Sequence, residues 1–244
     1  MNTLEDKVIL VTGAASGLGA AISQQLVQAR ARVVLADLDA DKAAQVAHEI
    51  DPQGHRTLAL SCDVGLAGAA ERAMGAIRRQ WGGLDVLINN AGTDHTASVQ
   101  DIAPEQWTRV VHTNLFGPFL LVKAGLTMLC EADQGRGGQI VNIASTASLR
   151  AWPNASAYHA SKWGLRGLSE ALHAEFRSSG IRVSTVIAGG MRTPFLLDRF
   201  PDIDLNVLQP PQNVASAILF LLGMPRGSVV AEIMVLPQQE TSWP

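Results

Sequence analysis

The segment Thr12-Gly13-Ala14-Ala15-Ser16-Gly17-Leu18-Gly19 follows an apolar run at residues 7–11 and opens a stretch with helical periodicity. Glycines at such a turn let the backbone bend sharply and approach an anion. The first N–H groups of the following helix and its positive dipole end attract negative charge. The segment therefore predicts a strand, a tight turn and a helix that bind a phosphate group. Its Gly-x-x-x-Gly-x-Gly spacing alone is also compatible with a turn that serves only close packing.

Six further short apolar runs lie at residues 32–36, 57–62, 84–88, 139–143, 182–187 and 229–235. Most are nearly continuous in apolar residues, as expected of strands buried on both faces. Segments with helical periodicity separate them, such as residues 17–29 and 155–179. This alternation predicts an α/β fold of the Rossmann type, a doubly wound seven-stranded parallel sheet with helices on both faces. We expect one domain over residues 1–244, with a small substrate lid around residues 194–209.

Composition excludes several classes of function. The 244 residues are 47% hydrophobic and 17% charged, as in one compact domain, and the formal charge of −3 with scattered Lys and Arg disfavours nucleic acid as a partner. The longest apolar runs carry polar interruptions and fall short of the roughly 20 residues of a membrane span. Cys62 and Cys130 have the spacing of neither a zinc site nor a redox pair, so we expect no metal and two buried, reduced thiols. With no signal-peptide pattern at the start, the expected location is the cytoplasm.

Asp37 ends the second predicted strand, where an acidic side chain can accept hydrogen bonds from the hydroxyl groups of an adenosine ribose. A phosphate on the ribose 2′ position would be repelled by this carboxylate. Neither Ala14 nor Ala15 supplies a compensating cation. The sequence therefore favours NAD over NADP as the cofactor. The alternative role for Asp37 is a cap on the next helix, which Asp39 could also provide.

Further motifs stand in order at the ends of the predicted strands. They are the glycine-rich segment at residues 12–19, Asp63-Val64, Asn89-Asn90-Ala91-Gly92, and Ser145 followed by Tyr158-His159-Ala160-Ser161-Lys162. Over nearly its whole length the chain resembles the single-domain short-chain dehydrogenases/reductases. Three positions depart from that pattern: Ala188-Gly189 stands where Pro-Gly is usual, Ala144 stands where a serine is usual, and Arg30 replaces a glycine after the first helix. We expect the loop after Ala188 to be less rigid in consequence.

Tyr158 and Lys162 are four residues apart on a predicted helix, so both side chains project from one face. A phenol normally titrates near 10, and an adjacent ammonium favours the phenolate and lowers the pKa. Tyr158 is therefore expected to carry the proton. The resemblance implies that Lys162 also hydrogen-bonds the nicotinamide ribose.

Ser145 follows the fifth strand, at the sheet edge where ligands bind in open α/β folds. Its hydroxyl can donate to a carbonyl oxygen, although Thr146 and Ser148 are close competitors. The resemblance implies that Asn114 holds a water that links the lysine to solvent. An asparagine within a helix could otherwise simply hydrogen-bond neighbouring backbone.

The remaining cofactor contacts rest on the resemblance. It implies that Asp63 and Val64 flank the adenine, that Asn90, Ala91 and Gly92 lie beneath adenosine and ribose, and that Thr193 contacts the pyrophosphate or carboxamide side. The expected cofactor-binding set is completed by Gly13, Ser16, Gly17, Leu18, Gly19, Asp37, Tyr158, Lys162 and Gly189. For the substrate pocket we expect Ser145, with Trp152 and Phe195 from the bordering loops.

These residues predict an NAD(H)-dependent oxidoreductase that interconverts a secondary alcohol and a ketone as a homodimer or homotetramer. One alternative is a reductase of a carrier- or coenzyme-linked oxoacyl group, which would need basic docking residues, for which Arg150, Arg192 and Arg199 are the candidates. The other is a dinucleotide sensor without turnover. The complete set of Asn114, Ser145, Tyr158 and Lys162 disfavours the sensor.

Overall fold

A computed structural model describes residues 4–240 and confirms the predicted fold class. The strands are β1 (Val8–Thr12), β2 (Arg32–Asp37), β3 (Thr57–Ser61), β4 (Val86–Asn89), β5 (Gln139–Ser145), β6 (Arg182–Ala188) and β7 (Glu232–Val235). The α-helices are α1 (Gly17–Gln28), α2 (Ala40–Ile50), α3 (Ala67–Trp81), α4 (Pro104–Val111), α5 (Gly117–Gly135), α6 (Ser156–Phe176), α7 (Pro194–Leu197) and α8 (Pro211–Leu222). Four short helical turns complete the described part: η1 (His112–Phe116), η2 (Thr146–Ser148), η3 (Arg177–Ser179) and η4 (Leu205–Val207).

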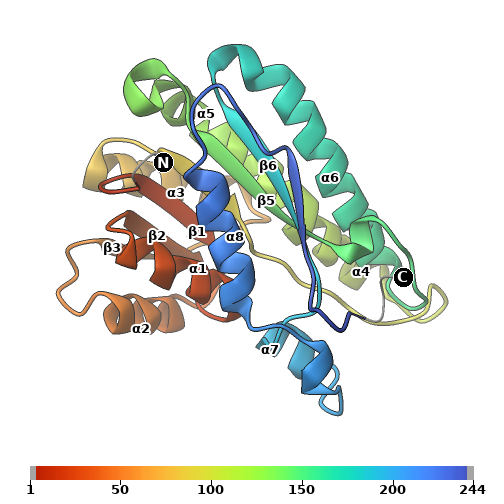
Figure 1. The fold of residues 1–244 in the computed structure, drawn as a ribbon. Coiled ribbons are helices and arrows are strands. Elements are labelled where there is room, and N and C mark those ends of the chain that lie inside the picture. Colours follow the sequence, from red (N-terminus) through yellow and green to blue (C-terminus); the bar gives the residue numbers. More distant parts are fainter. Residues whose placement is uncertain (1–3, 241–244) are drawn as a thin grey trace.

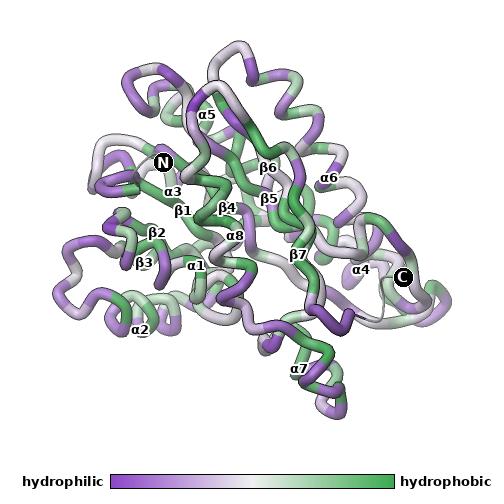
Figure 2. The backbone as a smooth tube through the Cα atoms, in the orientation of Figure 1, coloured by the Kyte–Doolittle hydropathy of each residue, from purple (hydrophilic) through white to green (hydrophobic). Residues whose placement is uncertain are grey.

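The seven strands form one parallel sheet in the order β3-β2-β1-β4-β5-β6-β7. The chain moves outward from β1 to β3 and then returns to the other side of β1 with β4 (Figure 1), which is labelled in Figure 2. The order therefore reverses between β1 and β4. In open α/β sheets the loops at such a point diverge and leave a crevice at the carboxyl ends of the strands.

The central strands are apolar on both sides because helices cover each face of the sheet, whereas the edge strands β3 and β7 are partly exposed. In β1, Ile9 and Val11 pack into a core with α1 and α8, while Val8 and Leu10 pack into a second core with α3 and α5. The central strands are accordingly mostly green, the hydrophobic colour, in Figure 2. Burial of side chains on both faces holds the strand ends, and thus the loops of the crevice, in fixed positions.

Two expectations from sequence need correction here. The helical stretch Pro104–Gly135 is long and apolar enough to cross a membrane by length and composition, which a search for uninterrupted apolar runs missed. Half of its most apolar window is buried inside the domain, as in a core helix that passes the same test. Both cysteines are free, but only Cys62 is fully buried, since Cys130 on α5 is partly exposed.

Two of the departures from the family pattern, Arg30 and Ala188, have different local outcomes. Arg30 has a φ of +64°, a left-handed conformation that is strained for residues other than glycine. Ala188 is the last residue of β6 and pairs with Ser145 of β5 and Val235 of β7. The backbone at Ala188 is therefore held by the sheet, and the expected loss of rigidity does not begin at this residue.

Candidate active site

The glycine-rich loop after β1 is tied to both neighbouring strands. The Thr12 hydroxyl accepts hydrogen bonds from the backbone N–H groups of Asn90 and Ala91, each at 3.0 Å. The Asn90 side-chain amide donates to Thr12 O (2.8 Å) and Gly13 O (3.1 Å). On the other side, Asp37 Oδ2 accepts from Ala15 N at 2.9 Å. The loop is therefore preorganised by side chains that come from β1, β2 and the loop after β4.

Gly13 and Gly19 make this loop possible in different ways. Gly13 has a φ of +63°, which favours glycine. A Cβ atom added at Gly19 would lie 2.0 Å from Gly13 O and 2.7 Å from Asn90 Nδ2. Gly19 is not among the described residues that line the cavity of the site. Gly19 therefore has a packing role, in which it lets α1 approach the loop, and its direct contact with the cofactor stays a prediction.

We predict that Gly19→Ala distorts the loop, because the rigid backbone oxygen of Gly13 has no room to move away. The expected result is a loss of about 1–3 kcal/mol of stability and a weakened affinity for dinucleotide. Gly167→Ala is the matched control, since Gly167 lies in α6 with open space around its Cβ direction. Chemical denaturation and NADH fluorescence titration of both variants test the prediction, and equal behaviour of the two would contradict it.

One cavity of about 1290 Å³ extends along the carboxyl ends of the strands. It is lined by every residue predicted to bind the cofactor except Gly19, namely Gly13, Ser16, Gly17, Leu18, Asp37, Asp63, Val64, Asn90, Ala91, Gly92, Tyr158, Lys162, Gly189 and Thr193. The predicted substrate residues Ser145, Trp152 and Phe195 line it too, whereas Asn114 and Arg150 do not. The structure thus brings the two predicted groups of residues to one continuous cavity.

The donors and acceptors of this cavity fit a dinucleotide. Ser16 begins α1 without a side-chain cap, and the first turn of α1 contains no acidic residue, so its N-terminus can face an anion. At the end near β2 lies the Asp37 carboxylate, and at the opposite end lie Tyr158 and Lys162. The cavity volume exceeds the roughly 300–1,000 Å³ of ordinary small-molecule pockets, which leaves space for a substrate beside a cofactor.

Tyr158 and Lys162 occupy successive turns of α6, and Lys162 Nζ lies 5.7 Å from the centre of the Tyr158 ring. Burial raises the pKa of Tyr158 to about 12, and a hydrogen bond with Ser145 counters part of that rise. The expectation that the pKa of Tyr158 lies below its usual value is therefore wrong for the protein alone. The loss of water around the phenolate outweighs the hydrogen bond with Ser145 and the positive charge of Arg199, both of which lower the pKa.

Lys162 is 5% exposed, and its ammonium donates a hydrogen bond of 2.8 Å to Ile143 O on β5. Burial lowers the pKa of Lys162 to about 8. With a pKa this close to neutral pH, the protonation of Lys162 can change when a negative or polar group enters the cavity.

Asn114 lies in the single turn of π-helix between α4 and α5, a feature frequent at functional sites. Its Oδ1 accepts from Thr93 N, and its Nδ2 donates to Thr93 O and to Ser161 Oγ, at 2.8, 2.8 and 3.0 Å. These bonds reach residues far away in sequence, so the Asn114 side chain does not simply hydrogen-bond the backbone of its own helix. It connects the loop after β4 to the helix that carries Tyr158 and Lys162, as a positioning residue.

Ser145 ends β5 with its hydroxyl accepting from Ala147 N at 3.2 Å and sharing a hydrogen bond with Tyr158. Thr146 also lines the cavity. Ser148 is fully buried and donates to Ser145 O at 2.6 Å. Among these three hydroxyls, that of Ser145 is the one hydrogen-bonded to the phenol, and Ser148 supports its backbone.

His159 holds the Trp152 loop. Its Nδ1 lies 3.0 Å from Ala147 O, its Nε2 accepts from Trp152 N at 3.0 Å, and its ring meets that of Trp152 edge-on with 4.3 Å between centres. Trp152 therefore borders the cavity in a defined position. Phe195 lies opposite, with its ring 5.9 Å from that of Tyr158.

Sequence reasoning missed other members of the site, which include Thr12, Asp94 and Glu240. Asp94 and Glu240 line the cavity, and Glu240 Oε2 accepts from Gly190 N at 3.3 Å. Thr12 was detectable, since it precedes the first glycine of the loop. Asp94 and Glu240 stand in segments without a periodic pattern, so no local signal marks them.

The chain matches the family described as short chain dehydrogenase over residues 7–204. It is 34% identical over 228 residues to 2,5-dichloro-2,5-cyclohexadiene-1,4-diol dehydrogenase LinX of Sphingobium indicum, with 90% of each chain covered. It is 36% identical over 225 residues to trans-4-hydroxycyclohexanecarboxylate dehydrogenase of Sinomonas cyclohexanicum, covering 88% of this chain and 85% of that protein. It is also 39% identical over 185 residues to D-threitol dehydrogenase of Mycolicibacterium smegmatis, covering 75% and 69%.

Two solved structures have the same fold over almost the whole chain. An alcohol dehydrogenase from the archaeon Thermococcus sibiricus, complexed with 5-hydroxy-NADP, superposes with a TM-score of 0.88 at 25% identity, covering 97% of this chain and 98% of that one. The 3-ketoacyl-(acyl-carrier-protein) reductase from Brucella melitensis, complexed with NADH, has a TM-score of 0.87 at 30% identity, covering 97% and 99%. These structural neighbours bind nicotinamide dinucleotides, of both the phosphorylated and the unphosphorylated kind.

Proposed function

The chain belongs to the short-chain dehydrogenase family, and from that premise we propose that it interconverts a secondary alcohol and a ketone with NAD(H). The proposal rests on one observation: Ser145, Tyr158 and Lys162 all line a cavity large enough for a dinucleotide. When bound, the dinucleotide would supply the hydride acceptor or donor. It would be held by the N-terminus of α1, by Asp37 and by the loop after β4.

The protein's own residues would handle the proton and the substrate oxygen. The Tyr158 hydroxyl, hydrogen-bonded to Ser145, would give a proton to the oxygen of a ketone or take one from an alcohol. Ser145 would orient that oxygen. Lys162 would place a positive charge beside the phenol, and Asn114 would keep the loop at Gly92 and Thr93 in register with α6.

We propose NAD rather than NADP because the Asp37 carboxylate lines the cavity at the end of β2, on the other side of β1 from β5 and Ser145. Its neighbours along the cavity, Leu38 and Asp63, bring no positive charge. Asp37→Ala should narrow the ratio of kcat/KM for NAD to that for NADP by about tenfold or more, since it removes repulsion of a 2′-phosphate. Steady-state kinetics with both cofactors test this. A wild-type protein that prefers NADP would refute the assignment.

A reductase of a carrier-linked substrate would need free basic residues to dock the carrier. Two of the three candidates, Arg192 and Arg199, make contacts within the protein. Arg192 donates through Nε to Leu205 O and Leu208 O. Arg199 is paired with Asp94 and lies over the ring of Phe195. The Arg199 guanidinium is therefore engaged within the protein, whereas Arg192 is exposed and bonds these carbonyls through Nε alone. We propose a small free alcohol as the substrate.

The function is tested by following nicotinamide absorbance with NAD or NADP and a panel of secondary alcohols and ketones. Activity with NAD that is absent from Tyr158→Phe supports the proposal. Mass spectrometry of the product separates free ketones from carrier-linked ones. Tight NADH binding without turnover of any panel member would instead contradict an alcohol-ketone reaction.

We further propose a homodimer or homotetramer in the cytoplasm. The rings of Phe116 and Phe119 stack 5.8 Å apart on the exposed side of η1 and α5, and Trp163 on α6 is also exposed. Exposed aromatic groups of this kind are typical of protein interfaces. Two unpaired cysteines fit a reducing compartment. Analytical ultracentrifugation checks the oligomeric state.

A further inference from the structure

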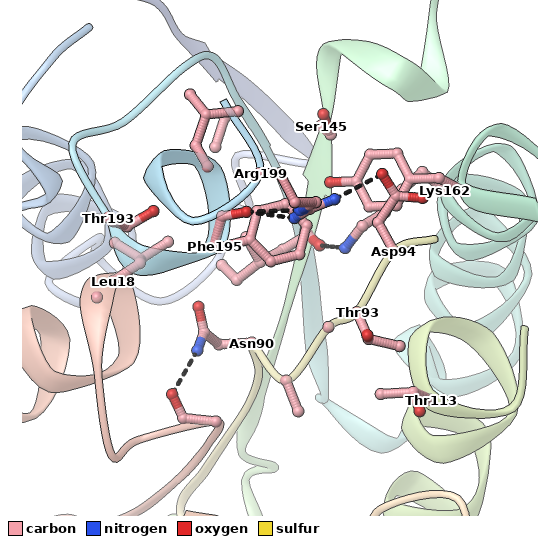
Figure 3. A pocket seen from close by; sticks show the side chains of 18 of the residues that line it. Leu18, Asn90, Thr93, Asp94, Thr113, Ser145, Lys162, Thr193, Phe195 and Arg199 are labelled. Atoms are coloured by element: carbon pink, nitrogen blue, oxygen red, sulfur yellow. Dashed lines mark hydrogen bonds and ion pairs between the residues drawn. The ribbon is translucent and has the colours of Figure 1, made fainter. Parts of the chain in front are cut away.

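A partly buried ion pair lies at the substrate end of the cavity. Asp94 follows β4, and its Oδ2 lies 2.6 Å from Arg199 Nη1, with the two side chains 9% and 23% exposed. Arg199 comes from the segment 194–209, lies 3.8 Å over the ring of Phe195, and donates from Nε to Phe195 O at 2.8 Å. Figure 3 shows Arg199 and Asp94 facing each other close to Lys162, Phe195 and Ser145.

The second oxygen of Asp94 is unusual. Oδ1 is buried and has no hydrogen-bond partner among the residues that the structure describes. Both Asp94 and Arg199 line the same cavity as Tyr158, and their charges act on the Tyr158 phenol in opposite directions, so they lie near the reacting oxygen. A buried acceptor without a partner is costly, which favours a ligand that brings a donor.

We propose that Asp94 is a specificity-determining residue, and that its Oδ1 accepts a hydrogen bond from a second hydroxyl group of the substrate. This inference rests on the proposed function and names its substrate class: neutral diols and polyols, in which Tyr158 and Ser145 bind the reacting hydroxyl. An ionised carboxylate only accepts hydrogen bonds, so it recognises an O–H donor.

The charge of the pair argues against an acidic substrate. Arg199 is neutralised by Asp94 and also bonds the backbone of Phe195, while a substrate carboxylate would meet the negative charge of Asp94. A monohydric alcohol would leave the buried Oδ1 of Asp94 without a donor, whereas a diol would supply one. Sites built around a substrate hydroxyl discriminate strongly against analogues that lack it, because the site's polar group is then unpaired.

The test compares alcohols with the same carbon skeleton: butane-2,3-diol with butan-2-ol, and cyclohexane-1,2-diol with cyclohexanol, each with NAD. We expect wild-type kcat/KM to be at least about tenfold higher for the diol of a pair. Asp94→Ala should abolish that preference while changing kcat/KM for the monohydric alcohol far less. Asp94→Asn, which keeps one acceptor oxygen but no charge, should be intermediate.

Two further variants separate substrate recognition from support of the loop. Arg199→Met breaks the ion pair but retains the Asp94 carboxylate. It should therefore lower kcat/KM for the diol and for the monohydric alcohol alike and keep their ratio. Asp202→Asn removes an exposed carboxylate of the same segment and should change neither rate. Equal losses for diol and monohydric alcohol in Asp94→Ala, or a wild-type preference for monohydric alcohols, would overturn the inference alone. Absence of Tyr158-dependent turnover of every alcohol would overturn the proposed function and this inference with it.

Discussion

Tyr158→Phe is expected to lower kcat by about 10²- to 10⁴-fold, the usual contribution of a positioned acid or base. The ring of Tyr158 is buried against Ala147 and Ala155 and lies near that of Phe195, so phenylalanine keeps this packing and loses only the hydroxyl. Dinucleotide affinity should stay nearly unchanged. Single-turnover kinetics and NADH titration of the same preparation measure the two effects separately.

A variant that retains turnover would remove Tyr158 from the proton-transfer role. Ser148→Ala is a suitable comparison, because it deletes a buried hydroxyl that bonds Ser145 O without lining the cavity. It is expected to cost about 1 kcal/mol in stability through the lost hydrogen bond. Its kcat should fall far less than that of Tyr158→Phe.

Lys162→Met is expected to lower activity and raise stability together. The pKa of Lys162 falls from 10.5 to about 8 on folding, so keeping the buried ammonium charged at pH 7 costs about 3 kcal/mol. Loss of the hydrogen bond to Ile143 O offsets roughly half of that gain. We expect a net stabilisation of about 1–2 kcal/mol, a rise in Tm of about 3–6 °C, and a loss of kcat of about 100-fold or more.

The pH dependence gives this prediction a second readout. Between about pH 8 and 10.5 the folded protein has released the Lys162 proton while the unfolded chain still holds it, so this group makes wild-type stability rise with pH. The advantage of Lys162→Met should therefore shrink across that window. Tyr158 acts with the opposite sign between pH 10 and about 12, because its folded pKa is raised.

Lys123→Met is the matched control, since Lys123 is exposed on α5. It should change neither activity nor the pH dependence of stability. Urea denaturation at pH 7 and at pH 10 measures the effect in all three proteins. A destabilised Lys162→Met variant at pH 7 would mean that the contacts of the ammonium outweigh its desolvation.

The reaction rate should show the same titration. Ketone reduction needs a protonated phenol, which a pKa of about 12 supplies throughout the accessible range. Its kcat/KM is therefore expected to be level below about pH 8 and to fall above it, as Lys162 loses its charge. A fall that persists unchanged in Lys162→Met would assign the titration to another group.

The sequence by itself determined the architecture and most of the cavity. Continuous apolar runs that alternate with helical segments are typical of a parallel sheet covered by helices on both faces, and the chain order of motifs places the loops at its carboxyl edge. Gly13, Asp37, Ser145, Tyr158 and Lys162 stand at a strand end or on one helix face, where local rules of spacing and periodicity point to a site. The resemblance to the family was needed to choose Ser145 over Thr146 and Ser148, and it alone pointed to Asn90.

Tertiary structure alone decided what those residues experience. The directions of the pKa shifts of Tyr158 and Lys162 depend on how much water the surrounding chain removes, which no spacing reveals. Gly19 proved to be a packing position because the backbone of Gly13 lies against it. Asp94 and Arg199 meet across 105 positions of sequence, and the buried Oδ1 of Asp94 exists only as a consequence of that meeting. Contacts between distant loops, and the loss of solvent that they cause, are properties of the fold as a whole.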